Sequence, residues 1–276
     1  MNISIEDLEI KAQKIRLRIV QMIGIGKTGH LGGSNSIADI IAALYFHKMK
    51  NNPENPKWEN RDRFILSKGH SALAQYAALA EAGYFPEDEL KKLKHLGAML
   101  QGHPDLLKTP GIEANTGSLG QGLSIACGIA AGFKIDKKYN RVYCIIGDGE
   151  AAEGQIWEAA MAATFYKLDN LIAILDYNKI QATGTIAERF DTGSLPDKFR
   201  AFGWHVLEID GHDMNQIVEA LDQADGVNGK PILIAAHTIK GKGVCFAENT
   251  AAYHNGSMTN EQYELACKSL GDEGAI

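Results

Sequence analysis

Long apolar runs, paired cysteines and an excess of basic charge are all missing from this sequence of 276 residues. No apolar run approaches the roughly 20 residues of a membrane-spanning helix, and the first seven residues are too polar for a signal peptide. The four cysteines include no Cys-x-x-Cys pair, which argues against a zinc site or disulfide framework. Lys and Arg number 28 against 34 Asp and Glu, without a basic stripe. We expect a cytoplasmic protein that binds neither nucleic acid nor membrane.

Two nucleotide-binding motifs are missing as well. Residues 24–30, "GIGKTGH", contain Gly-Lys-Thr, but a phosphate-binding P-loop requires a glycine at position 21, where this chain has Gln21. No Gly-x-Gly-x-x-Gly fingerprint follows a first strand either. The glycine-rich loop "GSLGQG" at 117–122 opens a predicted helix, and its backbone is a candidate for holding another kind of cofactor. The sequence therefore excludes a P-loop NTPase.

The hydropathy pattern predicts one α/β domain over residues 1–276. The helical patterns span 5–25 and 36–50, and short apolar runs span 63–67, 141–148, 170–178, 204–210 and 231–238. Apolar runs separated by helices are typical of a mostly parallel sheet with helices on both faces. Thr259 and Gln262 form a capping-box pattern, which predicts a closing helix over about 259–270.

Asp148 lies where an apolar run gives way to a helical stretch, in "IIGDGEAAEGQIWEAA". The carboxyl ends of parallel strands form the ligand-binding edge of such a sheet, and Asn178 follows the next predicted strand at the same edge. Their side-chain oxygens and the Ile180 carbonyl are hard ligands suited to Mg²⁺ or Ca²⁺, whose coordination a diphosphate would complete. A lone Gly-Asp-Gly is more often an aspartate that caps the next helix. The matching position of Asn178 favours a metal site.

Seven segments resemble the transketolase family and occur in order along the chain. They are "TGHLGGS" (28–34), "DRFILSKGHSA" (62–72), "GHPD" (102–105), "TGSLGQGLS" (116–124), "GDGEAAEGQIWEA" (147–159), "NKIQATG" (178–184) and "TIKGKGV" (238–244). The Gly-Asp-Gly with Asn178 resembles the thiamine diphosphate signature. The chain is similar to the diphosphate-binding half of a transketolase, which implies two-carbon ketol transfer from a ketose phosphate to an aldose phosphate, as in the pentose phosphate pathway.

The resemblance implies a role for each matching residue. The metal would be held by Asp148, Asn178 and the Ile180 carbonyl. The residues implied to bind thiamine diphosphate are His70, Gly117, Leu119, Gly149, Asn178 and His254. The residues implied to act in catalysis are His30 and His103, which face the sugar, His254 beside the thiazolium ring, and Glu153, which links the two cofactor sites of a dimer.

Several histidines and lysines stay without an assigned role, because an isolated histidine is more often a surface or core residue than a catalytic one. The sequence supports no chemistry for His47, His95, His205 and His212. His237 ends a predicted strand near the same edge but lies outside the matched positions. Lys240 and Lys242 of "IKGKG" suit a phosphate contact, and a solvated basic turn explains them equally well.

The resemblance also implies a partner chain. A whole transketolase has a pyrimidine-binding domain with a catalytic glutamate and arginines for the substrate phosphate, whereas this sequence ends at Ile276, after the diphosphate domain. This implies a split transketolase, active only with a complementary C-terminal subunit, in a heterotetramer with two copies of each chain. Two alternatives stay open: half of another thiamine diphosphate enzyme, similar to deoxyxylulose phosphate synthase or a 2-oxo acid dehydrogenase, or a non-catalytic cofactor-binding module.

Overall fold

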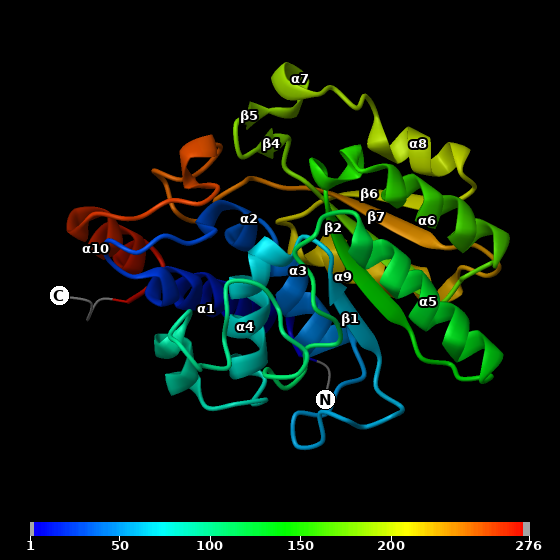
Figure 1. Cartoon of the computed structure of the whole chain (residues 1–276), viewed down its shortest axis with the longest axis horizontal. Helices are drawn as coiled ribbons and strands as arrows, with labels where there is room; N and C mark the ends of the chain where they lie inside the picture. The colour runs from blue at the N-terminus through cyan, green and yellow to red at the C-terminus, as the bar shows by residue number, and fades with distance from the viewer. Residues whose placement is uncertain (1–2, 273–276) are drawn as a thin grey trace.

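The computed structural model describes residues 3–272, so the ends of the predicted domain, 1–2 and 273–276, lie outside the described residues. Its main sheet has five parallel strands in the order β1-β2-β3-β7-β6. They are β1 (Arg63–Leu66), β2 (Val142–Gly147), β3 (Leu171–Tyr177), β6 (His205–Asp210) and β7 (Ile232–His237). A small antiparallel hairpin projects from the body of the domain (Figure 1) and consists of β4 (Ile180–Gln181) and β5 (Gly184–Thr185). The five predicted runs are the five parallel strands.

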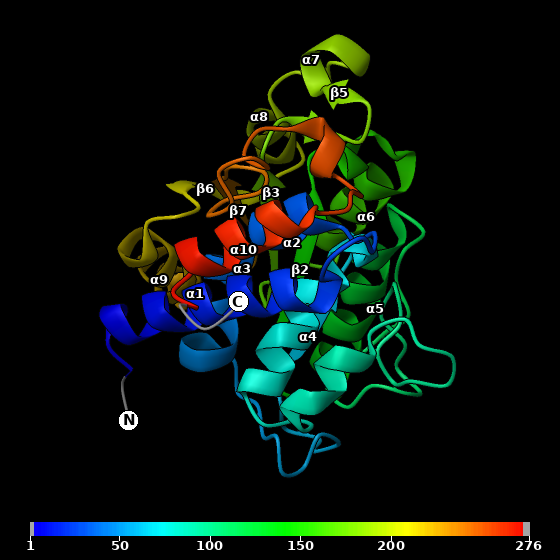
Figure 2. The ribbon, with the colours of Figure 1, turned by 90° about the vertical axis from the view of Figure 1, so that its left-hand side faces the viewer.

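Helices cover both faces of this sheet (Figure 1), which confirms the predicted α/β class. One face carries α1 (Ile5–Ile23), α3 (Ala38–Ala43), α4 (Ala72–Glu81) and α9 (Met214–Gln223). The other face carries α5 (Gln121–Ile135), α6 (Gly154–Phe165) and α8 (Leu195–Ala201). The remaining α-helices of the described chain are α2 (Leu31–Asn35), α7 (Ile186–Arg189) and α10 (Asn260–Ser269), of which α10 lies alongside α1 (Figure 2).

The central strands are buried on both faces. In β3, Ile172 and Ile174 belong to the core that includes α1 and α4, whereas Ala173 and Leu175 belong to the core under α5 and α6. Successive side chains of a strand point to opposite faces, so the apolar residues of this strand meet apolar neighbours on both sides of the sheet. This explains why the sequence has continuous apolar runs here rather than an apolar–polar alternation.

Local capping sets the ends of the first and last helices. The Ser4 side chain accepts the N–H of Asp7 (3.0 Å) at the start of α1, and Gly24, with a φ of 65°, ends that helix. At the start of α10, Thr259 and Gln262 form both bonds of a capping box. The predicted start of this closing helix is therefore the observed one.

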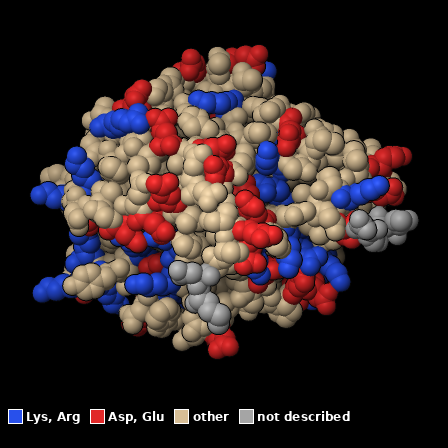
Figure 3. Space-filling model, turned by 180° about the vertical axis from the view of Figure 1, so that it is seen from behind, with Lys and Arg blue, Asp and Glu red and all other residues tan. Residues whose placement is uncertain are grey.

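The surface carries charges of both signs, and Figure 3 shows acidic and basic side chains interspersed on one face. Within residues 3–272, no helix combines the length and apolarity needed to cross a membrane.

Residues 36–50, predicted as one helix, form α3 followed by a π-helical turn at Leu44–Lys48. All five main strands run in the same direction, so the loops that follow them meet at a single edge of the sheet.

Candidate active site

A cavity of about 190 Å³ lies at this edge of the sheet. The predicted site residues that line it are His70, Leu119, Asp148, Gly149, Asn178, Ile180 and His254. They come from the loops after β1, β2 and β3, from the 117–122 loop and from the segment before α10. Residues far apart in sequence meet here because the parallel strands that carry these loops end together.

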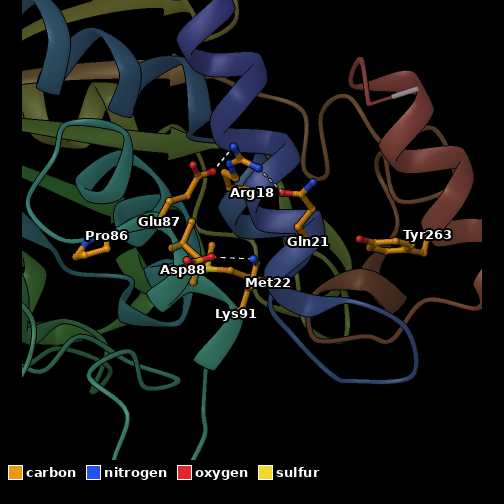
Figure 4. A pocket seen from close by; sticks show the side chains of 9 residues that line it. Arg18, Gln21, Met22, Pro86, Glu87, Asp88, Lys91 and Tyr263 are labelled. Atoms are coloured by element: carbon orange, nitrogen blue, oxygen red, sulfur yellow. Dashed lines mark hydrogen bonds and ion pairs between the residues drawn. The ribbon is translucent and has the colours of Figure 1, made fainter. Parts of the chain in front are cut away.

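A larger hollow, of about 580 Å³, lies between α1, the 3-10 helix Glu87–Lys92 and α10 (Figure 4). Its charged side chains pair with one another, Arg18 with Glu87 and Lys91 with Asp88. The predicted site residues do not line it. The smaller cavity is therefore the candidate site, because it contains the converging polar groups.

Asp148 follows β2 directly and is almost fully buried, with 3% of its surface exposed. One carboxylate oxygen accepts the N–H of Gly149 (2.7 Å), and the other accepts the N–H of Lys179, beyond β3. Burial, together with the nearby Asp176 carboxylate, raises the pKa of Asp148 to about 6. Because this carboxylate is costly to ionise alone, a bound cation would stabilise it, and each oxygen keeps a free lone pair. Asp148 therefore fits the role of a metal ligand.

Asn178 and Ile180 line the same cavity just beyond β3. The Asn178 Oδ1 accepts the N–H of Ile180 (3.1 Å), and the Ile180 carbonyl accepts a hydrogen bond from the Lys240 ammonium (2.7 Å). Within residues 3–272, no three His, Cys, Asp or Glu side chains group together in a way that could hold a metal. A cation here would thus depend on Asp148, on the amide and carbonyl oxygens and on a bound diphosphate.

A buried ion pair, missed by the sequence analysis, supports the floor of the cavity. Lys68 and Asp176 are both buried, and the Lys68 ammonium binds the Asp176 carboxylate and the Gly33 carbonyl (2.8 Å). Asp176 also accepts hydrogen bonds from Ser36 (2.7 Å) and Asn178 (2.9 Å). Burial would raise the pKa of Asp176, but the Lys68 charge holds it below its ordinary value. Asp176 thus orients Asn178 and stays ionised.

Glu150 is a second residue that the sequence analysis missed. It is 3% exposed, and its carboxylate accepts the Ser67 hydroxyl, the N–H of Gly120 (2.8 Å) and the N–H of Gly147 (2.9 Å). These three groups come from the end of β1, the 117–122 loop and the end of β2. Burial raises the pKa of Glu150. One carboxylate therefore ties together three of the loops that form the cavity.

Lys240, for which the sequence left two interpretations, lies in the cavity wall and is 2% exposed. Its ammonium contacts the Ile180 carbonyl and the His254 Nδ1 (2.9 Å). Burial, together with the positive charge of Lys68, lowers the pKa of Lys240 to about 8. A buried ammonium that forms no ion pair within residues 3–272 is suited to bind an anionic ligand. The interpretation as a solvated turn is wrong for Lys240.

Four histidines cluster beside the cavity. The ring centroids of His30 and His254 lie 5.2 and 5.0 Å from that of His70, and His103 lies 6.3 Å from His30. Burial, with the charge of neighbouring lysines, lowers the pKa of His70 to about 2, of His254 to about 3 and of His30 to about 4. Burial and Lys94 also lower the pKa of His103. These imidazoles are neutral near pH 7, and each has a ring nitrogen that can accept a hydrogen bond.

The predicted residues Gly117 and Glu153 do not line the cavity, but Gly117 begins the 117–122 loop that bounds it and Glu153 lies against that loop at Gly120. Gly117 has a φ of 142°, and a Cβ atom there would lie 2.7 Å from the His103 ring. Glu153 is exposed at the start of α6, and its Cβ would clash with a side chain at position 120. His237 instead pairs with Glu208 (3.3 Å) outside the cavity lining.

Comparison with known proteins identifies the family of this chain. The family model for the "Transketolase, thiamine diphosphate binding domain" matches residues 8–275. The chain belongs to the transketolase family. A similar protein is the 6-deoxy-6-sulfo-D-fructose transketolase subunit SqwG of Clostridium sp. (strain MSTE9), 51% identical over 98% of this chain and 98% of that subunit. An apulose-4-phosphate transketolase subunit of Phocaeicola vulgatus is 44% identical over 97% of this chain and 95% of its own length.

Longer transketolases match the chain over only part of their length. Human transketolase is 38% identical, and the match covers 96% of this chain but 42% of that protein. The crystal structure of transketolase from Campylobacter jejuni superposes with a TM-score of 0.90 at 36% identity, covering 98% of this chain and 43% of that one. The resemblance to the N-terminal subunit of a split transketolase is therefore confirmed, and the family model supports a thiamine diphosphate-binding domain.

Proposed function

We propose that this chain is the diphosphate-binding subunit of a two-chain transketolase that moves a two-carbon ketol unit from a ketose to an aldose. The observation that carries the proposal is the lining of one cavity by Asp148, Asn178 and Ile180, with four histidines beside it. The similarity to two transketolase subunits over nearly their whole length supports it.

The cavity provides distinct groups for a metal and a diphosphate. Asp148, Asn178 and the Ile180 carbonyl would hold Mg²⁺ or Ca²⁺, since all three line the cavity and offer oxygen ligands. The Lys240 ammonium would bind the diphosphate oxygens, and the Gly149 N–H, which donates to Asp148 in this structure, would share its hydrogen with them. When bound, thiamine diphosphate supplies the electron sink that lets a carbon–carbon bond of the sugar break.

The remaining predicted cofactor contacts surround these groups. His70 and His254 line the cavity beside the proposed diphosphate position, and Leu119 offers an apolar side chain to the cofactor rings. The backbone at Gly117 would lie beside the same rings, where a side chain would displace His103. These residues would fix the orientation of the cofactor and exclude water from it.

His30, His103 and His254 would act on the sugar. Ketol transfer requires that a hydroxyl proton be removed and later returned; a neutral imidazole would take the proton, and the imidazolium so formed would give it back. The lowered pKa values of His30 and His254 keep these rings unprotonated at neutral pH. They therefore carry no positive charge that would repel the cationic thiazolium ring, and each offers a ring lone pair to a sugar hydroxyl.

Positive charge near these histidines favours an anionic sugar. The Lys94 ammonium donates a hydrogen bond to the Thr28 carbonyl (2.9 Å). Burial is the main cause of the lowered pKa values of His30 and His103, and the positive charge of Lys94 is the second. The similar subunits are named for a sulfonated ketose and for a sugar phosphate. We therefore propose an anionic ketose as donor, with either a sulfonate or a phosphate group.

A complementary C-terminal subunit would complete the site. The assembly would contain two copies of each chain and would lie in the cytoplasm. Glu153 is the N-cap residue of α6. Farther along this helix, Met161 and Phe165 are 51% and 77% exposed, and Tyr166, just beyond it, is 61% exposed. Apolar groups that lie close together at a surface are typical of a protein interface. This face would meet another chain, with Glu153 near the two-fold axis.

Reconstitution tests the proposal. The purified chain, given thiamine diphosphate, Mg²⁺, an anionic ketose and an aldose acceptor, should transfer no ketol unit. Addition of the complementary subunit should restore transfer and produce a particle whose mass equals two copies of each chain. Parallel assays with 6-deoxy-6-sulfofructose and fructose 6-phosphate identify the donor class. Turnover by the chain alone, with contamination excluded by mass spectrometry, would refute the two-chain proposal, and decarboxylation of pyruvate in place of ketol transfer would refute the reaction.

A further inference from the structure

A chain of hydrogen bonds between largely buried groups runs from α1 to the segment that carries Lys240. Arg16 of α1 binds both carboxylate oxygens of Asp39 in α3, one of them at 2.9 Å. The other oxygen lies 2.7 Å from the Nδ1 of His212, in the loop after β6. The His212 Nε2 lies 2.8 Å from the backbone nitrogen of Ile239, beyond β7. Four separate segments of the chain are linked in this way.

These contacts determine which nitrogen of His212 carries the proton. A backbone N–H only donates, so the Nε2 that faces Ile239 must be an unprotonated acceptor. The ring proton therefore lies on Nδ1 and is donated to Asp39. Burial would raise the pKa of Asp39, but Arg16 and His212 hold it below its ordinary value, so it accepts as a carboxylate. The Asp39 carboxylate thus fixes both the orientation and the tautomer of the ring.

The loop of His212 packs closely against the segment after β7. The Gly211 N–H donates to the His237 carbonyl (2.8 Å), and a Cβ atom at Gly211 would lie 2.5 Å from the Thr238 side chain. This contact requires glycine and places the next residue, His212, under the backbone of Ile239. Thr238 itself binds Asp176. The amide between Thr238 and Lys240 is therefore held by His212.

We propose that His212 is a positioning residue for Lys240, because it holds the Ile239 N–H and so fixes the direction in which the Lys240 side chain leaves the backbone. The Lys240 ammonium reaches the Ile180 carbonyl and His254, inside the cavity. An imidazole outside the cavity thereby sets the position of a cation inside it. This inference rests on the proposed function, in which Lys240 binds the diphosphate.

Two substitutions at His212 separate its two hydrogen bonds. Glutamine places an acceptor oxygen near the position of Nε2 and so keeps the bond to Ile239. Asparagine places a donor near the position of Nδ1, which keeps the bond to Asp39 and leaves the Ile239 N–H unpaired. His205→Asn is a matched control, because His205 is exposed on β6 and only its backbone takes part in the sheet.

Hydrogen–deuterium exchange of the cofactor-free chain reads the Ile239 amide directly. A lost hydrogen bond of this kind is expected to speed exchange about tenfold in His212→Asn. The wild type, His212→Gln and His205→Asn should exchange alike. Equal exchange in the wild type and His212→Asn would overturn the inference, and so would a His212→Gln variant that exchanges as fast as His212→Asn.

Thiamine diphosphate affinity, measured with Mg²⁺ and the complementary subunit, provides the second readout. His212→Asn should raise the dissociation constant about tenfold, with kcat at saturating cofactor within about twofold of the wild type. Lys240→Met should weaken binding as well, and adding His212→Asn to it should have no further effect. Additive effects of the two changes would overturn the inference. Absence of cofactor binding by the wild type would instead refute the proposed function, while the exchange experiment would still test His212.

Discussion

Replacing Asp148 with asparagine tests the proposed metal site through the stability of the cofactor-free chain. Asp148→Asn keeps the size of the side chain and removes its charge. Burial and the neighbouring Asp176 raise the pKa of Asp148 from an ordinary 3.8 to about 6. This increase corresponds to roughly 3 kcal/mol. Without a cation, ionising this one carboxyl group therefore costs the folded chain about that much.

The sign of the effect fixes the pH range of the experiment. Because the pKa of Asp148 is higher in the folded than in the unfolded chain, its stabilising contribution is fully present below pH 3.8 and is lost as the pH rises through about 6. The wild type should thus lose roughly 3 kcal/mol of unfolding free energy relative to Asp148→Asn between about pH 4 and pH 7.5. Asparagine has a single side-chain oxygen and so accepts only one of the two backbone N–H groups that Asp148 accepts. This lost hydrogen bond changes the unfolding free energy of the variant by the same amount at every pH.

Urea unfolding of both proteins in EDTA, at pH steps across this range, measures the difference. Adding Mg²⁺ and thiamine diphosphate at pH 7.5 should stabilise the wild type and leave Asp148→Asn unchanged, because only the carboxylate offsets the charge of the cation. Asp148→Ala should likewise bind no cofactor in calorimetry with Mg²⁺. Parallel stability curves for the wild type and Asp148→Asn would refute the argument from burial. Wild-type cofactor affinity in Asp148→Ala would refute the metal site.

Three further substitutions test other parts of the site. His103→Ala should bind thiamine diphosphate normally while turnover with the complementary subunit falls by a factor on the order of 10²; an unchanged rate would leave His103 a structural role only. Glu150→Gln should destabilise the chain by about 1–3 kcal/mol in urea, because its amide would face a backbone N–H that now donates to a carboxylate. Lys68→Met should cost about 3–5 kcal/mol by leaving Asp176 buried without its cation, and a loss below about 1 kcal/mol would contradict this.

The sequence by itself determined where the strands lie and which loops meet at the site. Strands buried on both faces need continuous apolar runs, so β2 and β3 are visible as such in the sequence. Parallel strands bring their carboxyl ends together, so Asp148 and Asn178 could be paired without coordinates. Both inferences depend on local pattern and on a general rule of topology, which is why they did not require the structure.

Only the tertiary structure decided which charged side chains are buried and what they bind. Lys240 could be assigned neither to a phosphate site nor to solvent, because its burial depends on Ile180 and on the segment before α10, both remote in sequence. The sequence gives one indication of Asp176, because it is a carboxylate inside an otherwise apolar strand. Its partner Lys68 could not be predicted, because it follows a different strand. The position of His212 depends on a contact between two loops. Burial and hydrogen-bond partners are properties of distant segments brought together, and hydropathy along the chain does not contain them.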